Sequence, residues 1–271
     1  MKATEHEASP KIRICVAGAA GRMGSLVVRE VTPPFVISGA IESADNPNLG
    51  RTLRDCDLSE SDVLLSAPAN IENAARECDV FVSFTSAKAE LMNLPHVVSL
   101  QKPVVIGTTG FSQEDRARLE SIVKPIPAVI TPNFSVGANF LFALTEKLSQ
   151  LPPSYDFSII EAHHNRKNDA PSGTANSIAD ILKARRGYTR TVHGRAGLSP
   201  RSPEELEVLS VRGGGIPGQH EVLAAGLSEM IKLEHTVFSR SAFVTGALLA
   251  AGWIVRQKPG LYGMKEVLGL Q

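Results

Sequence analysis

Residues 161–175 hold the densest group of chemically active side chains in the chain. They read Glu-Ala-His-His-Asn-Arg-Lys-Asn-Asp-Ala-Pro-Ser-Gly-Thr-Ala, which places two imidazoles, an ammonium group and a hydroxyl–glycine–hydroxyl turn in one run. Charged groups at this density are costly to bury unless they are paired, so a hydrophobic core has no need of them. The run therefore indicates a binding or catalytic site.

The second half of the run is typical of a site for an anion. Ser172 is a preferred helix-capping residue, and Pro171 suits the start of a helix. Gly173 lets a ligand approach the backbone N–H groups of a first helical turn, and Thr174 adds a hydroxyl group. Lys167 and a protonated histidine would add cationic donors. We therefore expect a carboxylate or a phosphate group to bind here.

The paired histidines, His163 and His164, supply an acid or a base that titrates near neutral pH. A metal site is less well supported, because adjacent residues of an extended chain point to opposite sides and a third ligand has no obvious spacing. A solvated loop before a capped helix is the other structural interpretation. Capping alone, however, requires neither the histidines nor Lys167.

The elements around this run would place it at a junction between a strand and a helix. Residues 157–160 (Phe-Ser-Ile-Ile) predict a strand, and residues 174–182 have the apolar spacing of an amphipathic helix. Such connections often carry binding residues, because rigid elements on both sides position them.

A glycine-rich turn near the N-terminus predicts a dinucleotide site. Residues 11–17 form an apolar run typical of a buried parallel strand, and residues 25–30 predict a helix. Between them, Gly18 allows a sharp turn, Gly21 lets a pyrophosphate approach the backbone, and Gly24 lets the helix pack closely on the strand. The spacing is Gly-x-x-Gly-x-x-Gly, so an alanine stands where the usual fingerprint has its second glycine.

The next predicted strand, residues 35–42, ends in an acidic residue. Glu42 lies about twenty residues beyond the glycine turn, where an acid typically binds the ribose hydroxyls of adenosine. An ordinary surface acid at a strand end is the alternative, and the glycine turn favours the ribose role.

Strands and helices continue to alternate and predict an α/β fold, a Rossmann-type doubly wound parallel sheet. The predicted strands cover residues 79–84, 103–107 and 128–131, and the predicted helices cover residues 87–100, 112–123 and 136–148. Ligands bind beyond the carboxyl ends of such strands. Residues 107–109 and 131–134 follow two of these ends, so we expect them on the nicotinamide side.

After residue 148 the pattern changes and predicts a second domain of α+β type with a mixed or antiparallel sheet. A long loop is expected over residues 187–205, followed by short strands at 207–212, 221–225 and 230–236. An apolar helix over residues 242–255 is expected to pack back on the first domain. We therefore predict a dinucleotide-binding domain of residues 1–134 completed by 241–271, and a substrate-binding and oligomerisation domain of residues 135–240.

The composition narrows the classes of function. The 271 residues carry no net formal charge, which gives no reason to expect nucleic acid or an anionic membrane as a partner. The three cysteines have no metal or redox spacing, which favours a reducing cytosol. The polar N-terminus lacks the apolar core of a signal peptide, and no apolar run is long enough to span a bilayer. These features predict a cytoplasmic protein.

Together these motifs resemble the 4-hydroxy-tetrahydrodipicolinate reductase family, formerly called dihydrodipicolinate reductase. The resemblance is carried by Val-Ala-Gly-Ala-Ala-Gly-Arg-Met-Gly at 16–24, Gly-Thr-Thr-Gly-Phe at 107–111, Asn-Phe-Ser-Val-Gly at 133–137, and the run at 161–175. It extends from about Lys11 to the C-terminus in consistent order, and the 161–175 run is its most specific part.

The resemblance implies reduction of 4-hydroxy-tetrahydrodipicolinate by NADH or NADPH with loss of water, a step of the diaminopimelate route to lysine. It implies a cytoplasmic homotetramer that binds a small cyclic dicarboxylate and no metal. His163 would be the proton donor, Lys167 its catalytic partner and His164 a substrate contact, while Gly173 and Thr174 would bind a substrate carboxylate. The other polar residues of the run, which remain without an assigned role, are Glu161, Asn165, Arg166 and Asp169.

The resemblance also implies a set of cofactor-binding residues along the first domain. They are Gly18, Ala19, Ala20, Gly21, Arg22, Met23, Glu42, Gly107, Thr108, Thr109, Thr131, Pro132, Asn133 and Phe134. Two departures from the family pattern stand out. Ser43 replaces an arginine of many relatives, so NADH should be used at least as well as NADPH, with Arg22 as a partial substitute. Gln219 lies in Gly-Gln-His-Glu, where Gly-Glu-His-Thr is usual, which affects local contacts and not the chemistry.

Two other functions are compatible with a Rossmann half. One is a different NAD-dependent dehydrogenase, acting on an amino acid or a sugar, which would not need the Lys-Asn-Asp-Ala-Pro-Ser-Gly-Thr sequence. The other is a dinucleotide-sensing protein without catalysis, which would not need to retain His163 and Lys167.

Overall fold

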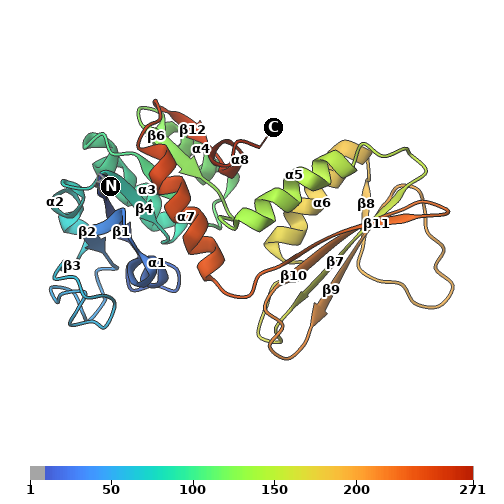
Figure 1. The fold of residues 1–271 in the computed structure, drawn as a ribbon, viewed down its shortest axis with the longest axis horizontal. Coiled ribbons are helices and arrows are strands. Elements are labelled where there is room, and N and C mark those ends of the chain that lie inside the picture. Colours follow the sequence, from blue (N-terminus) through green and yellow to red (C-terminus); the bar gives the residue numbers. More distant parts are fainter. Residues whose placement is uncertain (1–9, 271) are drawn as a thin grey trace, which may run out of the picture. The chain divides into compact units, whose positions relative to one another are not determined.

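The computed structural model describes residues 10–270, which form two compact units. One unit runs to Phe134 and is completed by Phe243–Gly269, and the other comprises Ser135–Ala242. Each unit has a sheet and a hydrophobic core of its own, so each is described separately (Figure 1). Within residues 10–270, no helix has both the length and the apolar composition needed to cross a membrane.

The first unit is built on a seven-stranded sheet in the order β12-β6-β5-β4-β1-β2-β3, with parallel pairing throughout, which confirms the predicted Rossmann-type fold. Its strands are β1 (Ile12–Ala17), β2 (Phe35–Ile41), β3 (Leu65–Ser66), β4 (Val80–Ser83), β5 (Val104–Ile106), β6 (Pro127–Ile130) and β12 (Gly260–Tyr262). The last four residues of β1 are fully buried, as a strand covered on both faces requires. The strand order reverses between β1 and β4, and in open parallel sheets ligands bind at such a point.

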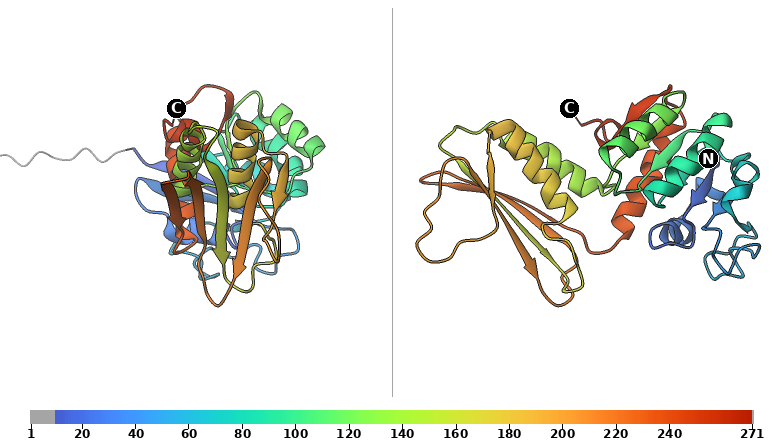
Figure 2. Two further views of the ribbon diagram at one scale, coloured as in Figure 1. Left: turned by 90° about the vertical axis from the view of Figure 1, so that its right-hand side faces the viewer. Right: turned by 180° about the vertical axis from the view of Figure 1, so that it is seen from behind.

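Helices cover both faces of this sheet, and each face has its own apolar cluster (Figure 2). The helices are α1 (Gly24–Glu30), η1 (Pro68–Asn70), α2 (Ile71–Ala75), α3 (Ala87–Ser99), α4 (Gln113–Val123), α7 (Ser241–Ile254) and α8 (Met264–Val267). As predicted, α7 packs on the first sheet, and eight of its residues join the cluster around β1. Gly246 makes the close approach possible, because a Cβ atom there would lie 1.7 Å from the Phe134 carbonyl oxygen.

The second unit is a five-stranded mixed sheet in the order β11-β10-β7-β9-β8. Its strands are β7 (Asp156–His163), β8 (Arg190–Val192), β9 (Glu205–Arg212), β10 (Gln219–Ala225) and β11 (Met230–Thr236). Both α5 (Val136–Leu148) and α6 (Gly173–Arg186) lie on one face of this sheet (Figures 1 and 2). Inward residues of the strands and both helices form one core, which includes Phe157, Ile159, Ile178, Val208 and Val222.

The structure adds several short elements that the sequence did not predict. The predicted loop over 187–205 contains β8, and β9 begins at Glu205, two residues before the predicted start. Helices α2 and α8 and strands β3 and β12 each have five residues or fewer. Elements this short carry too few residues to show a period, and their pairing with neighbours in the fold decides their conformation.

Candidate active site

The glycine turn between β1 and α1 has the close packing that its spacing predicts. Gly18 has a φ of +74°, and a Cβ atom at this position would lie 2.4 Å from the Phe84 carbonyl oxygen. A Cβ atom at Gly24 would lie 2.0 Å from the Gly18 carbonyl oxygen. Any larger residue at either position would therefore displace backbone atoms, so both glycines are required for the turn.

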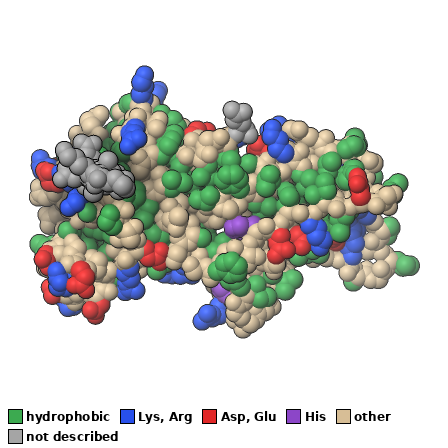
Figure 3. Space-filling model, viewed as in Figure 1, with side chains coloured by type: hydrophobic (Ala, Val, Ile, Leu, Met, Phe, Trp, Pro, Cys, Tyr) green, Lys and Arg blue, Asp and Glu red, His purple; other side chains and the backbone are tan. Residues whose placement is uncertain are grey.

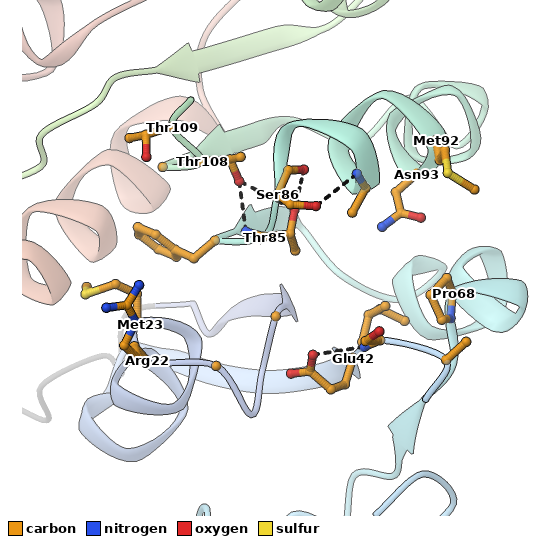
Figure 4. A pocket seen from close by; sticks show the side chains of 18 residues that line it. Arg22, Met23, Glu42, Pro68, Thr85, Ser86, Met92, Asn93, Thr108 and Thr109 are labelled. Carbon is orange, nitrogen blue, oxygen red and sulfur yellow. Dashed lines mark hydrogen bonds between the residues drawn. The ribbon is translucent and has the colours of Figure 1, made fainter. Parts of the chain in front are cut away.

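A cavity of about 640 Å³ opens beside this turn, within the usual size range of ligand sites (Figure 4). Eight of the predicted cofactor residues line it, namely Gly18, Gly21, Arg22, Met23, Glu42, Gly107, Thr108 and Thr109. Figure 4 shows Thr85 and Thr108 on one side of the cavity and Glu42 on the other. The cavity thus lies at the carboxyl ends of β1, β2, β4 and β5, as expected for this fold.

The Glu42 carboxylate is tied to the backbone on both sides. Its Oε2 accepts the N–H of Ala20 at 2.7 Å, and its Oε1 accepts the N–H of Ser43 at 2.9 Å. The side chain of Ser43 forms a hydrogen bond to the Asp45 carboxylate. Glu42 is therefore fixed at the end of β2, and Ser43 connects it to a second acid, Asp45.

A buried carboxyl group joins two of the strand ends at this cavity, and the sequence analysis did not single it out. Glu90 of α3 is fully buried, and its Oε1 accepts hydroxyl protons from Ser83, Thr85 at 2.8 Å and Thr108 at 2.7 Å. The Thr108 hydroxyl also accepts the N–H of Thr85 at 2.8 Å. Burial raises the pKa of Glu90, against the hydrogen bonds that lower it. The signal for this role is the burial of Glu90 in an amphipathic helix. The residue type alone does not reveal that burial.

The segment after β6 does not line this cavity. Thr131, Asn133 and Phe134 are buried, while Pro132 is exposed. The Thr131 hydroxyl accepts the N–H of Asn133 at 3.2 Å, and the ring of Phe134 contacts Phe84, with 5.8 Å between the ring centroids. The segment lies at the carboxyl end of β6, next to the end of β5, and its contact with the cavity is through Phe84.

In the second unit, the 161–175 run connects β7 to α6, as predicted. Ser172 caps α6, and its hydroxyl accepts the N–H of Ala175 at 3.2 Å. Among residues 10–270, no atom would lie within 4 Å of a Cβ placed on Gly173. Gly173 and Thr174 form the first turn of α6, where helices present N–H groups to anions, and the space beside Gly173 is open.

Glu161 is the centre of the hydrogen bonds in this run, a role its spacing did not reveal. Its carboxylate is fully buried and lies 2.6 Å from His163 Nδ1. Arg212 of β9 donates two hydrogen bonds to it, at 2.8 and 2.7 Å, and the N–H of Ser172 donates a third at 3.1 Å. Burial raises the pKa of Glu161, but hydrogen bonds from Arg212, Ser210 and His163 outweigh it and lower the pKa to about 2.

Within residues 10–270, the His163 ring forms a hydrogen bond through Nδ1 alone. The Glu161 carboxylate can only accept, so His163 Nδ1 carries a hydrogen and donates it. A Cβ atom on Gly218 would lie 3.4 Å from His163 Nε2, so the glycine keeps space beside this atom. Burial lowers the pKa of His163 below its ordinary value, and the hydrogen bond to Glu161 offsets part of this shift.

A second buried histidine lies beside His163. The rings of His163 and His220 meet edge to face with 5.1 Å between centroids, and His220 Nε2 is 2.8 Å from the Ser172 hydroxyl. Burial, followed by the charge of His163, lowers the pKa of His220 to about 4. His220 is therefore neutral at physiological pH and supports the Ser172 cap.

The side chain of Lys167 is held by a carboxylate, whereas the Nδ1 atom of His164 takes part in no hydrogen bond among residues 10–270. The Lys167 ammonium group lies 2.7 and 2.8 Å from the two carboxylate oxygens of Asp169. The backbone N–H of Lys167 donates to the His164 carbonyl at 3.1 Å, which closes a turn. The Nδ1 atom of His164 is buried and has no hydrogen-bond partner within residues 10–270. In the same range, no three His, Cys, Asp or Glu side chains are grouped as metal ligands.

Comparison with known proteins shows matches over almost the whole chain. The family model described as "Dihydrodipicolinate reductase, N-terminus" matches residues 12–134, and "Dihydrodipicolinate reductase, C-terminus" matches residues 137–268. A 4-hydroxy-tetrahydrodipicolinate reductase of Methanopyrus kandleri is 42% identical, over 95% of this chain and 96% of the relative. One of Syntrophotalea carbinolica is 39% identical, over 96% of this chain and 100% of the relative.

Solved structures show the same fold. The dipicolinate-bound dihydrodipicolinate reductase from Paenisporosarcina sp. TG-14 has a TM-score of 0.73 at 22% identity, over 94% of this chain and 98% of that one. An amine dehydrogenase from Mycobacterium smegmatis has a TM-score of 0.62 at 14% identity, over 95% and 96% of the two chains. The fold alone is thus shared with other dehydrogenases, whereas both halves of the sequence match one family. The chain belongs to the dihydrodipicolinate reductase family, whose curated members are named 4-hydroxy-tetrahydrodipicolinate reductase.

Proposed function

We propose that this protein reduces 4-hydroxy-tetrahydrodipicolinate to tetrahydrodipicolinate, with loss of water, in the diaminopimelate route to lysine. The observation that carries the proposal is the Glu161–His163 and Asp169–Lys167 arrangement at the start of α6, in a chain matched over both halves by this family. A histidine that can donate a proton and a lysine, beside an open helix start, suit a substrate that carries carboxylates and must be protonated.

The substrate carboxylate is assigned to the first turn of α6. The open space beside Gly173 admits a planar carboxylate to the N–H groups of Gly173 and Thr174. Lys167 adds positive charge from the preceding turn, and His164 is assigned as a further substrate contact. A larger side chain at residue 173 would occupy the space that the carboxylate needs.

His163 and Lys167 serve the protonation. The bound nicotinamide supplies a hydride that is added at C4 of the conjugated imine left after the loss of water. Negative charge then develops towards the ring nitrogen, and a ring carbon takes up a proton. His163 donates this proton from Nε2, because its Nδ1 is engaged by Glu161, and the ammonium group of Lys167 stabilises the developing charge.

The cofactor is proposed to bind in the cavity lined by Arg22, Glu42 and Thr108, as a dinucleotide with its adenosine ribose at Glu42. The remaining predicted cofactor contacts are Gly18, Ala19, Ala20, Gly21, Met23, Gly107, Thr109 and residues 131–134. Glu42 lies close to Asp45 through Ser43, so a 2′-phosphate would meet two acids and gain no arginine at residue 43. NADH is therefore proposed to serve at least as well as NADPH.

The protein is proposed to be a cytoplasmic homotetramer. Strand residues alternate between the two faces of a sheet, and the face of the second sheet opposite α5 and α6 carries Ile160, Leu209 and Leu223. The same face carries Glu207, Glu221 and Lys232 beside these apolar residues, and a mixed face without helices suits a contact between copies. Cys15 and Cys78 are buried free thiols and Cys56 is a partly buried one.

The decisive assay supplies freshly made 4-hydroxy-tetrahydrodipicolinate with NADH or NADPH and follows the loss of nicotinamide absorbance. We expect turnover that depends on the substrate, with NADH at least as effective as NADPH. Absence of turnover by folded protein that binds NADH would contradict the proposed function.

A further inference from the structure

A largely buried ion pair, formed by Glu161 and Arg212, lies next to the two residues assigned to the protonation step, His163 and Lys167. Glu161 is fully buried, and Arg212 exposes only 20% of its side chain. Their two hydrogen bonds, at 2.7 and 2.8 Å, have the parallel geometry that makes guanidinium–carboxylate pairs rigid. Glu161 and Arg212 lie on strands β7 and β9, which pair directly.

Arg212 also contacts Asp169, the residue that holds the Lys167 ammonium group. Its Nη2 donates to the backbone carbonyl of Asp169 at 2.7 Å, and the Asp169 carboxylate holds the Lys167 ammonium group. One guanidinium group therefore contacts the partner of His163 on one side and the residue that holds Lys167 on the other. A displacement of Arg212 would disturb both cationic side chains together.

We propose that Glu161 and Arg212 are a positioning pair, which fixes His163 with Nε2 as its proton-donating atom and fixes the Asp169–Lys167 segment beside it. The proposal rests on the function proposed above. Neither residue needs to touch the substrate, because both act through the groups that they hold.

The geometry explains why a carboxylate is needed at residue 161. An acceptor at Nδ1 fixes both the ring orientation and the proton on Nδ1, which leaves Nε2 for proton exchange. Arg212 holds this carboxylate in place through two hydrogen bonds, while the protonated form of His163 is itself a cationic partner for it. Within residues 10–270, Nε2 is the His163 ring nitrogen without a hydrogen bond, and the side chain remains 12% exposed.

Charges of both signs surround His163 and set how it titrates. Glu161 favours its protonated form, while Lys167 and Arg212 disfavour it. His220 packs against the ring as a neutral group, and Asp169 offsets the charge of Lys167. Removal of Glu161 and removal of Arg212 should therefore shift the proton affinity of His163 in opposite directions.

The first test is the titration of His163, followed by NMR in protein labelled with ¹⁵N-histidine. The signal is assigned by its loss in His163→Gln. We expect the pKa of His163 to fall in Glu161→Gln, which removes a nearby anion, and to rise in Arg212→Met, which removes a cation. In the unaltered protein, the neutral ring should carry its proton on Nδ1. Shifts in the same direction, no shift, or a proton on Nε2 would overturn the proposal.

The second test is the dependence of kcat on pH. The donor must be protonated, so kcat falls as the pH rises through the pKa of His163. This fall should begin at lower pH in Glu161→Gln and at higher pH in Arg212→Met, and kcat at its plateau should drop roughly 10-fold to 100-fold in each variant, as for other supports of a functional histidine. An unaltered pH profile and kcat in both variants would contradict the proposal.

Controls separate a failure of this proposal from a failure of the proposed function. If the unaltered protein shows no turnover, the proposed function is wrong, and the NMR titration still tests the pair. If Arg212→Met does not fold, Arg212→Lys keeps the charge but loses the double hydrogen bond, and should lower kcat while it leaves the pKa of His163 closer to that of the unaltered protein. Equal dissociation constants for NADH in all variants are expected, because the pair lies in the second unit and the cofactor cavity in the first.

Discussion

His163 and Lys167 are each held by a carboxylate two positions away in the sequence. Glu161 precedes His163 and lies on its Nδ1, whereas Asp169 follows Lys167 and lies on its ammonium group. The surroundings of the two acids differ, because Glu161 is fully buried and Asp169 is 59% exposed. His163 is thus fixed in a rigid setting, while Lys167 is held by a pair that water can screen and that can exchange for a substrate.

The proposed roles predict a specific kinetic pattern for these two residues. His163→Ala and Lys167→Ala should each lower kcat by about 10²-fold or more, because each removes a proton donor or a cation near the developing charge. The dissociation constant of NADH, measured by fluorescence, should change little. Lys183→Ala, in the last turn of α6, is the control and should retain activity. Weaker NADH binding with unchanged kcat would mean that the site is wrongly assigned.

The end of β2 predicts the cofactor preference. The unaltered protein should use NADH at least as well as NADPH, because with the adenosine ribose at Glu42, as proposed, a 2′-phosphate would meet Glu42 and Asp45. Ser43→Arg should raise kcat/KM for NADPH by about tenfold, equivalent to about 1.4 kcal/mol. Ser43→Ala is the control for loss of the hydroxyl alone. A strong preference of the unaltered protein for NADPH in steady-state kinetics would contradict this assignment.

At the scale of elements, Glu90 joins α3 to the ends of β4 and β5. Three hydroxyl groups from those strand ends converge on one of its oxygens, and two of them, on Thr85 and Thr108, belong to residues that line the cofactor cavity. The Glu90 hydrogen bonds should therefore set the spacing of the two loops, after β4 and after β5, that line the cavity. A carboxyl group in this position is buried without a cation, which is why its pKa is raised.

We expect Glu90→Ala to destabilise the protein by about 1–3 kcal/mol, because it leaves buried hydroxyl groups without their acceptor. It should also weaken NADH binding. Glu90→Gln keeps one carbonyl acceptor and should lose less on both counts. Glu114→Gln, an exposed acid in the first turn of α4, is the control. Thermal unfolding and NADH titration measure the two effects. A Glu90→Ala protein with the stability and NADH affinity of the unaltered protein would contradict this role of Glu90.

The sequence predicts long elements well and side-chain networks poorly. The longer strands and helices of the first unit follow from apolar runs and glycine turns, which are local signals, whereas β3, β12, α2 and α8 do not. Strand β8 was missed because three residues with an exposed arginine show no period. Glu161 and Arg212 were not paired in advance because 51 positions separate them, and only the pairing of β7 with β9 brings them together. Glu90 was missed because its burial depends on the packing of α3.

At the scale of the whole molecule, the proposed assembly depends on one face of the second sheet. The sheet face that carries Ile160, Leu209 and Leu223 lies opposite the helices of its own unit. The surface drawn in Figure 3 mixes acidic, basic and apolar side chains, so charge of one sign does not oppose association on that view. The proposed tetramer would bury the apolar strand residues that the second unit leaves without helices.

Light scattering coupled to size exclusion tests this assembly. The unaltered protein should have about four times the chain mass of 29.0 kDa. Leu223→Glu should give a smaller species, because it places a charge at the centre of the proposed contact. Leu227→Glu, in the fully exposed turn after β10, is the matched control and should remain a tetramer. A monomer in the unaltered protein, or a tetramer that survives Leu223→Glu, would contradict the proposed contact.

The central claim is that the protein transfers a hydride from NADH to C4 of the dehydrated substrate ring. The most direct measurement supplies NADH deuterated at both C4 positions with freshly made 4-hydroxy-tetrahydrodipicolinate, and analyses the product by mass spectrometry and NMR. We expect tetrahydrodipicolinate with one deuterium, at ring C4, formed in step with oxidised cofactor. Product without deuterium, deuterium at another carbon, or no product from folded protein that binds NADH would contradict it.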